Sequence, residues 1–375
     1  MKYYIIAGEA SGDLHASNLI KELKKRDPKA DFRCWGGDLM QQQGVTLAKH
    51  YRELAFMGFV EVLLNIKTIL QNLSFCKKDV LEYKPDVLIL VDYPGFNLKI
   101  AVWAKKMGIK VFYYISPQIW AWKQNRVYKI KRYVDKMFVI LPFEKDFYAK
   151  FNVEVDFVGH PLLDAIESRT ITPLDEFCKQ NNLQQKPIIA LLPGSRKQEI
   201  QTMLPIMLSA IKSFPDYQFV VAGAPSQDTE FYKIYLSEQS REIGTSCALL
   251  ENKTYQLLEH STAALVTSGT ATLETALFKI PQIVCYKANA ISFQIAKAVI
   301  KVKYISLVNL IADKVLVKEL IQNELNTTQL KAELVKLLEP THRSQLLSDY
   351  NELQQKLGGV GASARTADLM ISYLN

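Results

Sequence analysis

The chain has 375 residues, which is enough for two or three domains of ordinary size. Hydrophobic residues make up 49% and charged residues 22%, which is typical of a globular protein and excludes a disordered, collagen-like or purely coiled-coil chain. The 46 basic and 38 acidic side chains leave a net charge of +8, which suits an anionic partner: nucleic acid, a phosphorylated small molecule or an acidic membrane surface.

Short apolar segments alternate with amphipathic ones along most of the chain. Most of the apolar segments are continuous, as in strands that are buried on both faces of a parallel sheet. They are residues 3–7, 32–35, 87–91, 111–115, 137–141, 155–158, 188–192, 218–222, 263–267 and 282–286. Amphipathic segments such as 16–26, 97–106 and 201–213 lie between them. This order predicts an α/β fold with open, doubly wound sheets.

A polar stretch at residues 167–186 interrupts the alternation, which then restarts. We therefore predict two Rossmann-like domains, residues 1–165 and 186–341, that face each other across a cleft. Residues 342–375 have a helical pattern, and we expect them to pack back on the N-terminal domain of their own chain or of a partner in a swapped homodimer. Ligands of doubly wound sheets bind at the carboxyl ends of the strands, so the turns there are the candidates for function.

The turn after the first expected strand contains Gly8, Ser11, Gly12, Asp13 and His15. A glycine-rich turn that opens a helix presents N–H groups to an anion or a sugar hydroxyl. It has neither the spacing of a dinucleotide fingerprint nor the Lys-Ser/Thr pair of a P-loop, so both of those interpretations are weak. A tight turn in which Ser11 or Asp13 caps the helix is the structural alternative. The number of polar side chains at one strand end favours a functional site.

Asp92 directly follows the expected strand at residues 87–91. An acid at the tip of a parallel strand lies where ligands bind, and a general base is wanted there. An aspartate that caps a helix or closes a turn explains the position about equally well.

Arg196 stands in a Gly-Ser-Arg turn after the first expected strand of the second domain. A guanidinium there can grip phosphate oxygens with two hydrogen bonds, although an isolated arginine is more often a plain surface residue. We expect no metal site, because the chain has no Asp-x-Asp triplet and its five cysteines are scattered without a Cys-x-x-Cys pair. Arginine, backbone N–H groups and helix dipoles would then neutralise a diphosphate.

A third turn places Ser268, Gly269 and Thr270 at the start of an expected helix. Small hydroxyl residues at a helix N-terminus suit a diphosphate, and Glu274, one helical turn later, could accept hydrogen bonds from a ribose diol. The structural alternative is a helix cap at Ser268 and a solvated Glu274. The presence of Arg196 in the same domain favours the phosphate interpretation.

Residues 120–136 combine basic and aromatic side chains, among them Trp120, Trp122, Lys123 and Arg126. This combination is typical of nucleic-acid surfaces and of interfaces with anionic lipid. A solvated basic helix is the structural alternative. The charge is spread over the whole chain and no nucleic-acid motif is present, which argues against nucleic acid.

Residues 56–73 have a helical apolar pattern, and no apolar run of the chain is long and uncharged enough to predict a membrane-spanning helix. Met57, Val60 and Leu64 fall on the polar side of this helix, where they would form an exposed patch suited to lipid or to a partner. If the helix is packed on both sides, that inference does not hold. The opposite face is expected to be core and contains Phe59, Val62, Leu63, Ile66, Ile69, Leu70 and Leu73.

Several segments occur in an order that resembles the lipid-A-disaccharide synthase family. The resemblance runs from residue 4 to about residue 320, and the ordered set is far more specific than any one motif. The chain departs from the family pattern at Val308, where the family has proline. The segments are residues 8–13, 92–97, 116–122, 159–161, 192–196, 268–274 and 306–310, which read GEASGD, DYPGFN, SPQIWAW, GHP, LPGSR, SGTATLE and SLVNL.

The resemblance implies a GT-B glycosyltransferase that needs no metal and no cofactor, since the UDP-sugar is a substrate. The donor would be UDP-2,3-diacylglucosamine and the acceptor 2,3-diacylglucosamine 1-phosphate. The products would be a β(1→6) disaccharide 1-phosphate and UDP, formed with inversion at the anomeric carbon. The enzyme would work in the cytoplasm, bound peripherally to anionic lipid at the inner face of the cytoplasmic membrane.

The resemblance also implies roles for individual residues. Asp92 is the first choice for the general base, with His15 and Asp13 as competitors that spacing alone does not exclude. The nucleotide-sugar would be held by Gly8, Ser11, Gly12, Arg196, Ser268, Gly269, Thr270, Glu274 and Asn309. The acyl chains, the acceptor phosphate or anionic head groups would be met by Met57, Val60, Leu64, Trp120, Trp122, Lys123 and Arg126.

Three other functions remain as alternatives. A UDP-N-acetylglucosamine 2-epimerase would share the architecture and the nucleotide site, but it would not need an exposed apolar helix or clustered tryptophans. The transferase that adds N-acetylglucosamine to a lipid-linked peptidoglycan precursor has a first turn richer in glycine. A basic nucleic-acid-binding protein would use the segment at 120–136 and would bind DNA in a salt-dependent way.

Overall fold

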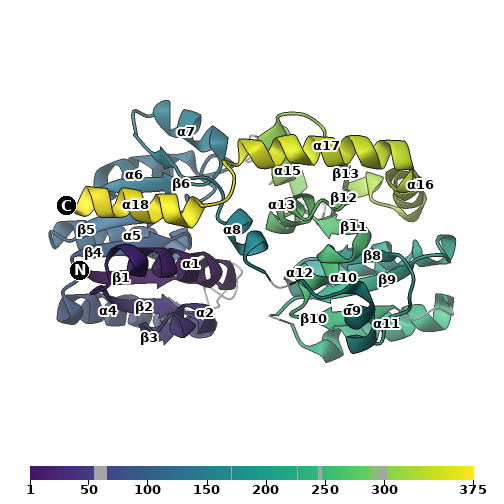
Figure 1. The fold of residues 1–375 in the computed structure, drawn as a ribbon, viewed down its shortest axis with the longest axis horizontal. Helices are drawn as coiled ribbons and strands as arrows, with labels where there is room; N and C mark the ends of the chain where they lie inside the picture. The colour runs from purple at the N-terminus through teal and green to yellow at the C-terminus, as the bar shows by residue number, and fades with distance from the viewer. Residues whose placement is uncertain (55–65, 170, 226, 244–246, 290–292, 295–301) are drawn as a thin grey trace. The chain divides into compact units, whose positions relative to one another are not determined.

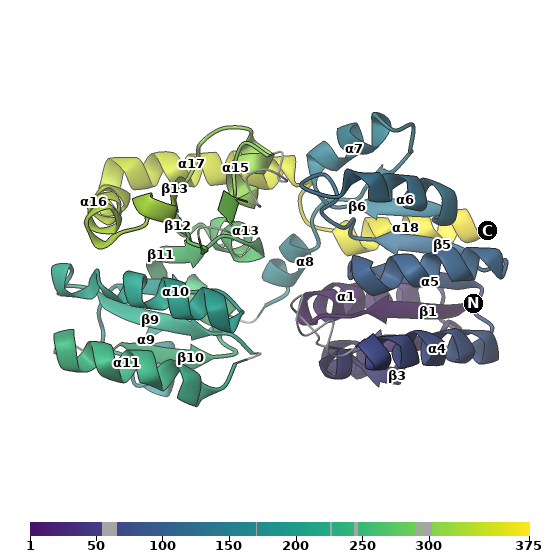
Figure 2. The ribbon, with the colours of Figure 1, turned by 180° about the vertical axis from the view of Figure 1, so that it is seen from behind.

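The computed structural model describes residues 1–375 with the exception of 55–65, 170, 226, 244–246, 290–292 and 295–301. The chain divides into two compact units, Met1–Ser168 with Leu357–Asn375, and Arg169–Lys356. In each unit helices surround one sheet (Figures 1 and 2). Both units therefore have the α/β architecture that the alternating pattern predicts.

Unit 1 contains a seven-stranded parallel sheet in the order β3-β2-β1-β4-β5-β6-β7. The order reverses between β1 and β4, and ligands of doubly wound sheets bind at such a switch point. The strands are β1 (Lys2–Ala7), β2 (Asp31–Gly36), β3 (Thr46–His50), β4 (Val87–Val91), β5 (Lys110–Tyr114), β6 (Lys136–Val139) and β7 (Asp156–Phe157). The helices are α1 (Ala10–Arg26), α2 (Asp38–Gln42), α4 (Ile66–Tyr83), α5 (Pro94–Lys106), α6 (Val127–Tyr133), α7 (Pro142–Ala149), α8 (Leu162–Glu167) and α18 (Ala362–Leu374).

Unit 2 contains a six-stranded parallel sheet in the order β10-β9-β8-β11-β12-β13, with its switch point between β8 and β11. The strands are β8 (Ile188–Leu192), β9 (Gln218–Gly223), β10 (Ala248–Glu251), β11 (Ser261–Thr267), β12 (Gln282–Tyr286) and β13 (Lys318–Ile321). The helices are α9 (Leu174–Gln180), α10 (Lys197–Leu208), α11 (Thr229–Ile243), α12 (Thr254–Glu259), α13 (Thr270–Leu277), α15 (Leu307–Ala312), α16 (Thr327–Leu338) and α17 (Pro340–Lys356).

The central strands form the core of each unit. Every residue of β4 and of β8 is buried, as continuous apolar runs require. Burial of a valine, leucine or isoleucine side chain contributes roughly 1.5–3 kcal/mol, so these strands dominate the stability of the sheets. The strands expected from apolar runs are all present, with ends that match or are shifted by at most two residues. The sequence did not predict β3, β10 and β13.

The C-terminal segment divides between the two units. Helix α18 packs on α1 and α8 in unit 1, and Asp164 accepts the N–H groups of Gly361 (2.6 Å) and Ser363 (2.8 Å) at its start. Helix α17 instead packs on α13, α15 and α16 in unit 2. We expected all of residues 342–375 to pack on the N-terminal domain, and for the α17 part this is wrong. Its apolar side chains Leu346, Tyr350 and Leu353 are buried within unit 2.

Helix α4 corrects part of the pattern expected over residues 56–73. Its buried arc contains Leu73 and Cys76 and is centred near Cys76, whereas Leu70 is 58% exposed. Leu70 lies about 120° from that centre at 100° per residue, so its assignment to the core was wrong. Met57, Val60 and Leu64 lie outside the described residues.

Asp79 fastens α4 to the sheet through a buried polar network. Its carboxylate accepts hydrogen bonds from Tyr4 Oη (2.6 Å) and from Arg33 Nε and Nη2 (2.8 and 2.6 Å), and Trp35 Nε1 donates to Tyr4 Oη at 2.8 Å. Burial alone would raise the pKa of Asp79, but the bonds from Arg33 and Tyr4 hold it below its usual value. The ionised carboxylate therefore stabilises the folded state.

We expect Asp79→Ala to lower the free energy of unfolding by about 2–4 kcal/mol, because Tyr4 and Arg33 would lose their partner. The difference from wild type should be complete above about pH 4, the unfolded pKa of aspartate, and shrink as pH falls through the lower folded value. Urea denaturation at several pH values measures both. Glu82→Gln, on the exposed side of α4, is the control and should change stability by less than about 0.5 kcal/mol. An Asp79→Ala protein as stable as wild type would contradict the role of the network.

Candidate active site and nucleotide site

In unit 1, the ends of β1 and β4 bring Gly8 and Asp92 to one edge of the sheet. Asp92 and Tyr93 both adopt left-handed backbone angles, with φ of 43° and 47°, which are strained for residues other than glycine. The carbonyl of Asp92 accepts hydrogen bonds from Asn97 Nδ2 (2.8 Å) and Tyr113 Oη (2.5 Å), which hold this turn. A side chain at Gly8 would meet the Tyr93 ring at 2.4 Å, so only glycine fits there.

The titratable groups at this edge differ in basicity. Burial, followed by the negative charge of Glu9, raises the pKa of Asp92 to about 7. Burial lowers the pKa of His15 to about 4, and that of His160, whose ring lies edge-on at 6.4 Å, to about 3. Near neutral pH both histidines are therefore neutral, whereas Asp92 is poised between its two protonation states.

Asp13 has a structural task. Its carboxylate accepts hydrogen bonds from the N–H groups of Gly37 (2.7 Å), Leu39 (3.1 Å) and Met40 (3.1 Å), and it thereby caps α2. These bonds occupy both oxygens, which argues against Asp13 as a general base. The structural alternative, in which Ser11 or Asp13 caps α1, does not hold either, because Glu9 is the N-cap residue and Ser11 lies exposed in the first turn.

A buried carboxyl group at the next strand ends escaped the sequence analysis. Glu144 accepts the N–H groups at the start of α7, and burial raises its pKa to about 7, while Ser116 and Trp120 moderate the rise. Ser116 in turn shares a 2.8 Å hydrogen bond with Tyr148 Oη. The group ties the loop after β5 to α7, and no motif spacing could have revealed it because its members come from three elements.

The two tryptophans of the basic segment lie in different environments. Trp120 is only 8% exposed and packs edge-on against Phe143 at 4.9 Å, so its expected place on the surface is wrong. Trp122 is 45% exposed, with Lys123 Nζ 4.2 Å and the Arg126 guanidinium 5.8 Å from its ring centre. Of the four residues predicted here, Trp122 and Lys123 are therefore exposed, Arg126 is partly buried and Trp120 is buried.

The turn after β8 in unit 2 is built around Glu199. Its carboxylate accepts the N–H groups of Ser195 (3.2 Å) and Arg196 (3.3 Å) and pairs with Arg196 Nη1 at 2.9 Å. Gly194, with φ of 106°, lets the chain pass close to Glu199. The Arg196 side chain is 67% exposed at the carboxyl edge of the sheet, where a phosphate can reach it.

The turn after β11 begins α13 at the neighbouring strand end. Gly269 is the N-cap residue, and Gly269 and Thr270 are exposed, whereas the Ser268 hydroxyl donates to the Ile305 carbonyl at 2.8 Å. Burial raises the pKa of Glu274 to about 7, and the Tyr255 hydroxyl beside it moderates the rise. In the turn after β8 the N–H groups of Ser195 and Arg196 are bound to Glu199, so the backbone donors offered to an anion in this unit are those at the start of α13.

Asn309 does not line this site. It is fully buried, its Nδ2 donates to the Val317 carbonyl and to Glu319 (both 2.9 Å), and its Oδ1 accepts the N–H groups of Leu316 and Val317. All of its hydrogen-bonding capacity is used within unit 2, so the expected contact with the nucleotide or the donor sugar is wrong in this structure.

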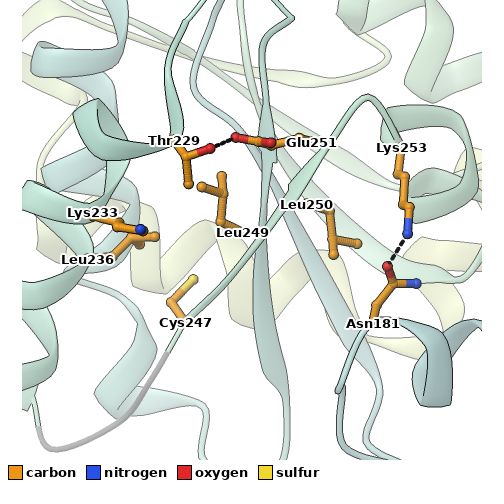
Figure 3. A pocket seen from close by; sticks show the side chains of 9 residues that line it. All are labelled: Asn181, Thr229, Lys233, Leu236, Cys247, Leu249, Leu250, Glu251 and Lys253. Atoms are coloured by element: carbon orange, nitrogen blue, oxygen red, sulfur yellow. Dashed lines mark hydrogen bonds between the residues drawn. The ribbon is translucent and has the colours of Figure 1, made fainter.

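A separate pocket lies beside the edge strand β10 and contains none of the predicted site residues (Figure 3). Four of its polar side chains form two pairs: Lys253 Nζ donates to Asn181 Oδ1 at 2.6 Å, and Thr229 donates to Glu251. Within the described residues, no group of three or more His, Cys, Asp or Glu side chains could hold a metal ion. No described helix has the length and apolar composition needed to cross a membrane.

Comparison with known proteins supplies a family. The family model of lipid-A-disaccharide synthetase matches residues 3–370. A lipid-A-disaccharide synthase of Syntrophus aciditrophicus is 40% identical over 99% of this chain and 97% of its own. The enzyme of the same name from Myxococcus xanthus is 39% identical with the same coverage.

Similar solved structures share the fold at low sequence identity. The UDP-GlcNAc 2-epimerase of Neisseria meningitidis, solved with UDP-GlcNAc, is 15% identical with a TM-score of 0.66 and full coverage of both chains. The calicheamicin glycosyltransferase is 15% identical with a TM-score of 0.59, covering 100% of this chain and 98% of its own. At these identities the likeness concerns the fold alone, the two-domain Rossmann-like architecture of GT-B enzymes.

Proposed function

This chain belongs to the lipid-A-disaccharide synthase family of glycosyltransferases, and we propose how its residues carry out the transfer. A 2,3-diacylglucosaminyl group moves from UDP to the 6-hydroxyl of 2,3-diacylglucosamine 1-phosphate. The C1–O bond to UDP breaks as the β(1→6) bond forms, with inversion. The site therefore has to accept a proton from the hydroxyl and stabilise the negative charge that develops on UDP.

Asp92 is the general base, and its position and pKa carry this proposal. It lies at the switch point of its sheet, and its pKa of about 7 matches the operating pH, which is the condition for efficient proton transfer. His15, with a pKa of about 4, is a weaker base, and Asp13 is occupied with α2. In the turn that contains Gly8, Ser11 and Gly12, both glycines are buried, and the exposed Ser11 contacts sugar hydroxyls beside Asp92.

The nucleotide binds at the two turns of unit 2. Arg196 and the N–H groups of Gly269 and Thr270 receive the diphosphate, where a guanidinium and a helix N-terminus both favour negative charge. Glu274 receives the ribose diol. These groups stabilise the leaving UDP without a metal ion, so we expect EDTA to leave the rate unchanged.

The basic group formed by the exposed Trp122 and Lys123 and the partly buried Arg126 binds anionic phosphate. Burial raises the pKa of Tyr113, and the Arg126 guanidinium is close enough to moderate that rise; Tyr113 in turn donates to the Asp92 carbonyl. No ion pair with either cation is formed within the described residues. Both cations are therefore available to the acceptor phosphate near the base or to anionic lipid, and they would hold the enzyme at the inner face of the cytoplasmic membrane.

Replacement of both cations in Lys123→Ala/Arg126→Ala should raise KM for the acceptor about tenfold or more, because two charge-assisted contacts are lost. KM for the UDP-sugar should not change. Vesicles with and without anionic lipid separate membrane affinity from acceptor affinity. Lys129→Ala/Lys131→Ala on α6 removes the same charge and is the control. Equal acceptor KM values for the two double variants would contradict a specific phosphate contact.

The decisive assay incubates purified protein with UDP-2,3-diacylglucosamine and 2,3-diacylglucosamine 1-phosphate, with and without EDTA, and follows the disaccharide by thin-layer chromatography. We expect equal product in both. Turnover of UDP-N-acetylglucosamine to its 2-epimer, without disaccharide, would overturn the lipid part of the proposal and favour the epimerase. Product that disappears with EDTA would overturn the metal-independent mechanism.

A further inference from the structure

Glu319 on β13 gathers four hydrogen bonds from the segment around the start of α15. Its Oε1 accepts from Ser306 N (3.0 Å), Ser306 Oγ (2.7 Å) and Asn309 Nδ2 (2.9 Å), and its Oε2 accepts from Ile305 N (3.1 Å). The ion pairs found among the described residues do not include Glu319. Its carboxylate is thus a multiple acceptor that fixes one loop, rather than half of an ion pair.

Ile305 connects this anchor to the nucleotide turn. While its N–H donates to Glu319, its carbonyl accepts the Ser268 hydroxyl at 2.8 Å. Ser268 N is bound to the Cys285 carbonyl at 3.1 Å, so both donors of Ser268 are used within unit 2. Phosphate oxygens need donors, and Ser268 has none left. Ser268 therefore shapes the turn, and the exposed Gly269 and Thr270 present it to a ligand.

We propose that Glu319 is a positioning residue for the donor diphosphate. It acts through Ser306 and Ile305 on Ser268, and so aligns the N–H groups at the start of α13. This inference rests on the proposed binding of UDP at that turn. No motif indicated Glu319, because it lies about fifty residues from Ser268 in the sequence and on a different strand.

Glu319→Gln tests whether Glu319 positions the turn at Ser268, because glutamine has nearly the same side-chain shape as glutamate. A carboxylate accepts at both oxygens, whereas the amide offers one acceptor oxygen and turns an NH2 group toward either Ile305 N or Ser306. At least one of the four bonds must break. The Ile305 carbonyl then shifts, and the turn at Ser268 loses its fixed position.

We expect Glu319→Gln to raise the calorimetric Kd for UDP and KM for the UDP-sugar about tenfold. KM for the acceptor and the pH profile of kcat should stay as in wild type, which general unfolding would not allow. Ser268→Ala should weaken UDP binding similarly, and adding Glu319→Gln to it should weaken binding no further, because both act in one chain of contacts. Glu324→Gln, exposed in the turn after β13, is the control and should bind UDP normally.

Two results would overturn the inference: normal UDP affinity in Glu319→Gln, or fully additive losses in the double variant. If Glu319→Gln does not fold, Ser306→Ala removes the 2.7 Å bond to Glu319, together with the bond that Ser306 Oγ accepts from Asn309 N, and has to weaken UDP binding for the inference to stand. A wild-type protein that does not bind UDP would instead contradict the proposed function. The two failures are therefore distinguishable.

Discussion

Asp92→Asn should lower kcat by at least about 100-fold, the usual loss when a general base is removed. The amide is the same size as the carboxylate, and asparagine tolerates the left-handed backbone that Asp92 adopts. The bonds from Asn97 and Tyr113 go to the main-chain carbonyl and remain. The variant therefore removes the proton acceptor and little else, and its melting temperature should not fall.

The pH profile identifies the base. In wild type, kcat/KM should rise with pH through about 7, because Asp92 must lose its proton before it can accept one. Asp92→Asn should lack this rise. His15→Gln should cost less than about tenfold, since the neutral His15 is the weaker base. A larger loss in His15→Gln than in Asp92→Asn would assign the base to His15.

The sequence predicted the buried strands and missed three of the four edge strands for a physical reason. Residues of β4 are apolar throughout because helices cover both faces of the sheet there. The strands β3, β10 and β13 lie at sheet edges, and four of the five residues of β3 are only partly buried and one is exposed. An edge strand needs no continuous apolar run, so Thr46–His50 has none. The same argument applies to β13, which carries Glu319.

The sequence located the candidate residues only where they follow strand ends. Asp92 in unit 1, and Arg196 and Gly269 in unit 2, could be placed because the turns after parallel strands lie at one edge of each sheet. The contacts that hold those turns could not be predicted, because they join distant parts of the chain. Asp13 reaches α2, and Glu319 reaches the start of α15. Sequence spacing also cannot tell that Trp120 is buried and Trp122 exposed, because the burial of each depends on an irregular turn.

Arg196→Ala should lower kcat/KM by about 100-fold or more, because the guanidinium stabilises the charge that develops on the departing diphosphate. The turn itself should persist, since Glu199 still accepts the N–H groups of Ser195 and residue 196. Arg196→Lys keeps the charge but loses the planar fork, so it should recover part of the rate and remain about tenfold below wild type. Steady-state kinetics with the UDP-sugar measure both variants.

Lys197→Ala is the matched control for Arg196, because it removes one positive charge from the next residue. Lys197 is exposed, with its Nζ 5.8 Å from the ring centre of Phe231, and it has no role in the proposed contact. Lys197→Ala should change kcat/KM by less than about threefold, because only the long-range electrostatic attraction of the domain for the anionic substrate is weakened. If Lys197→Ala lowered kcat/KM as much as Arg196→Ala, the diphosphate would be stabilised by the net charge of the turn and not by a specific contact with Arg196. A loss confined to Arg196 requires a directional contact, since both variants lower the net charge equally.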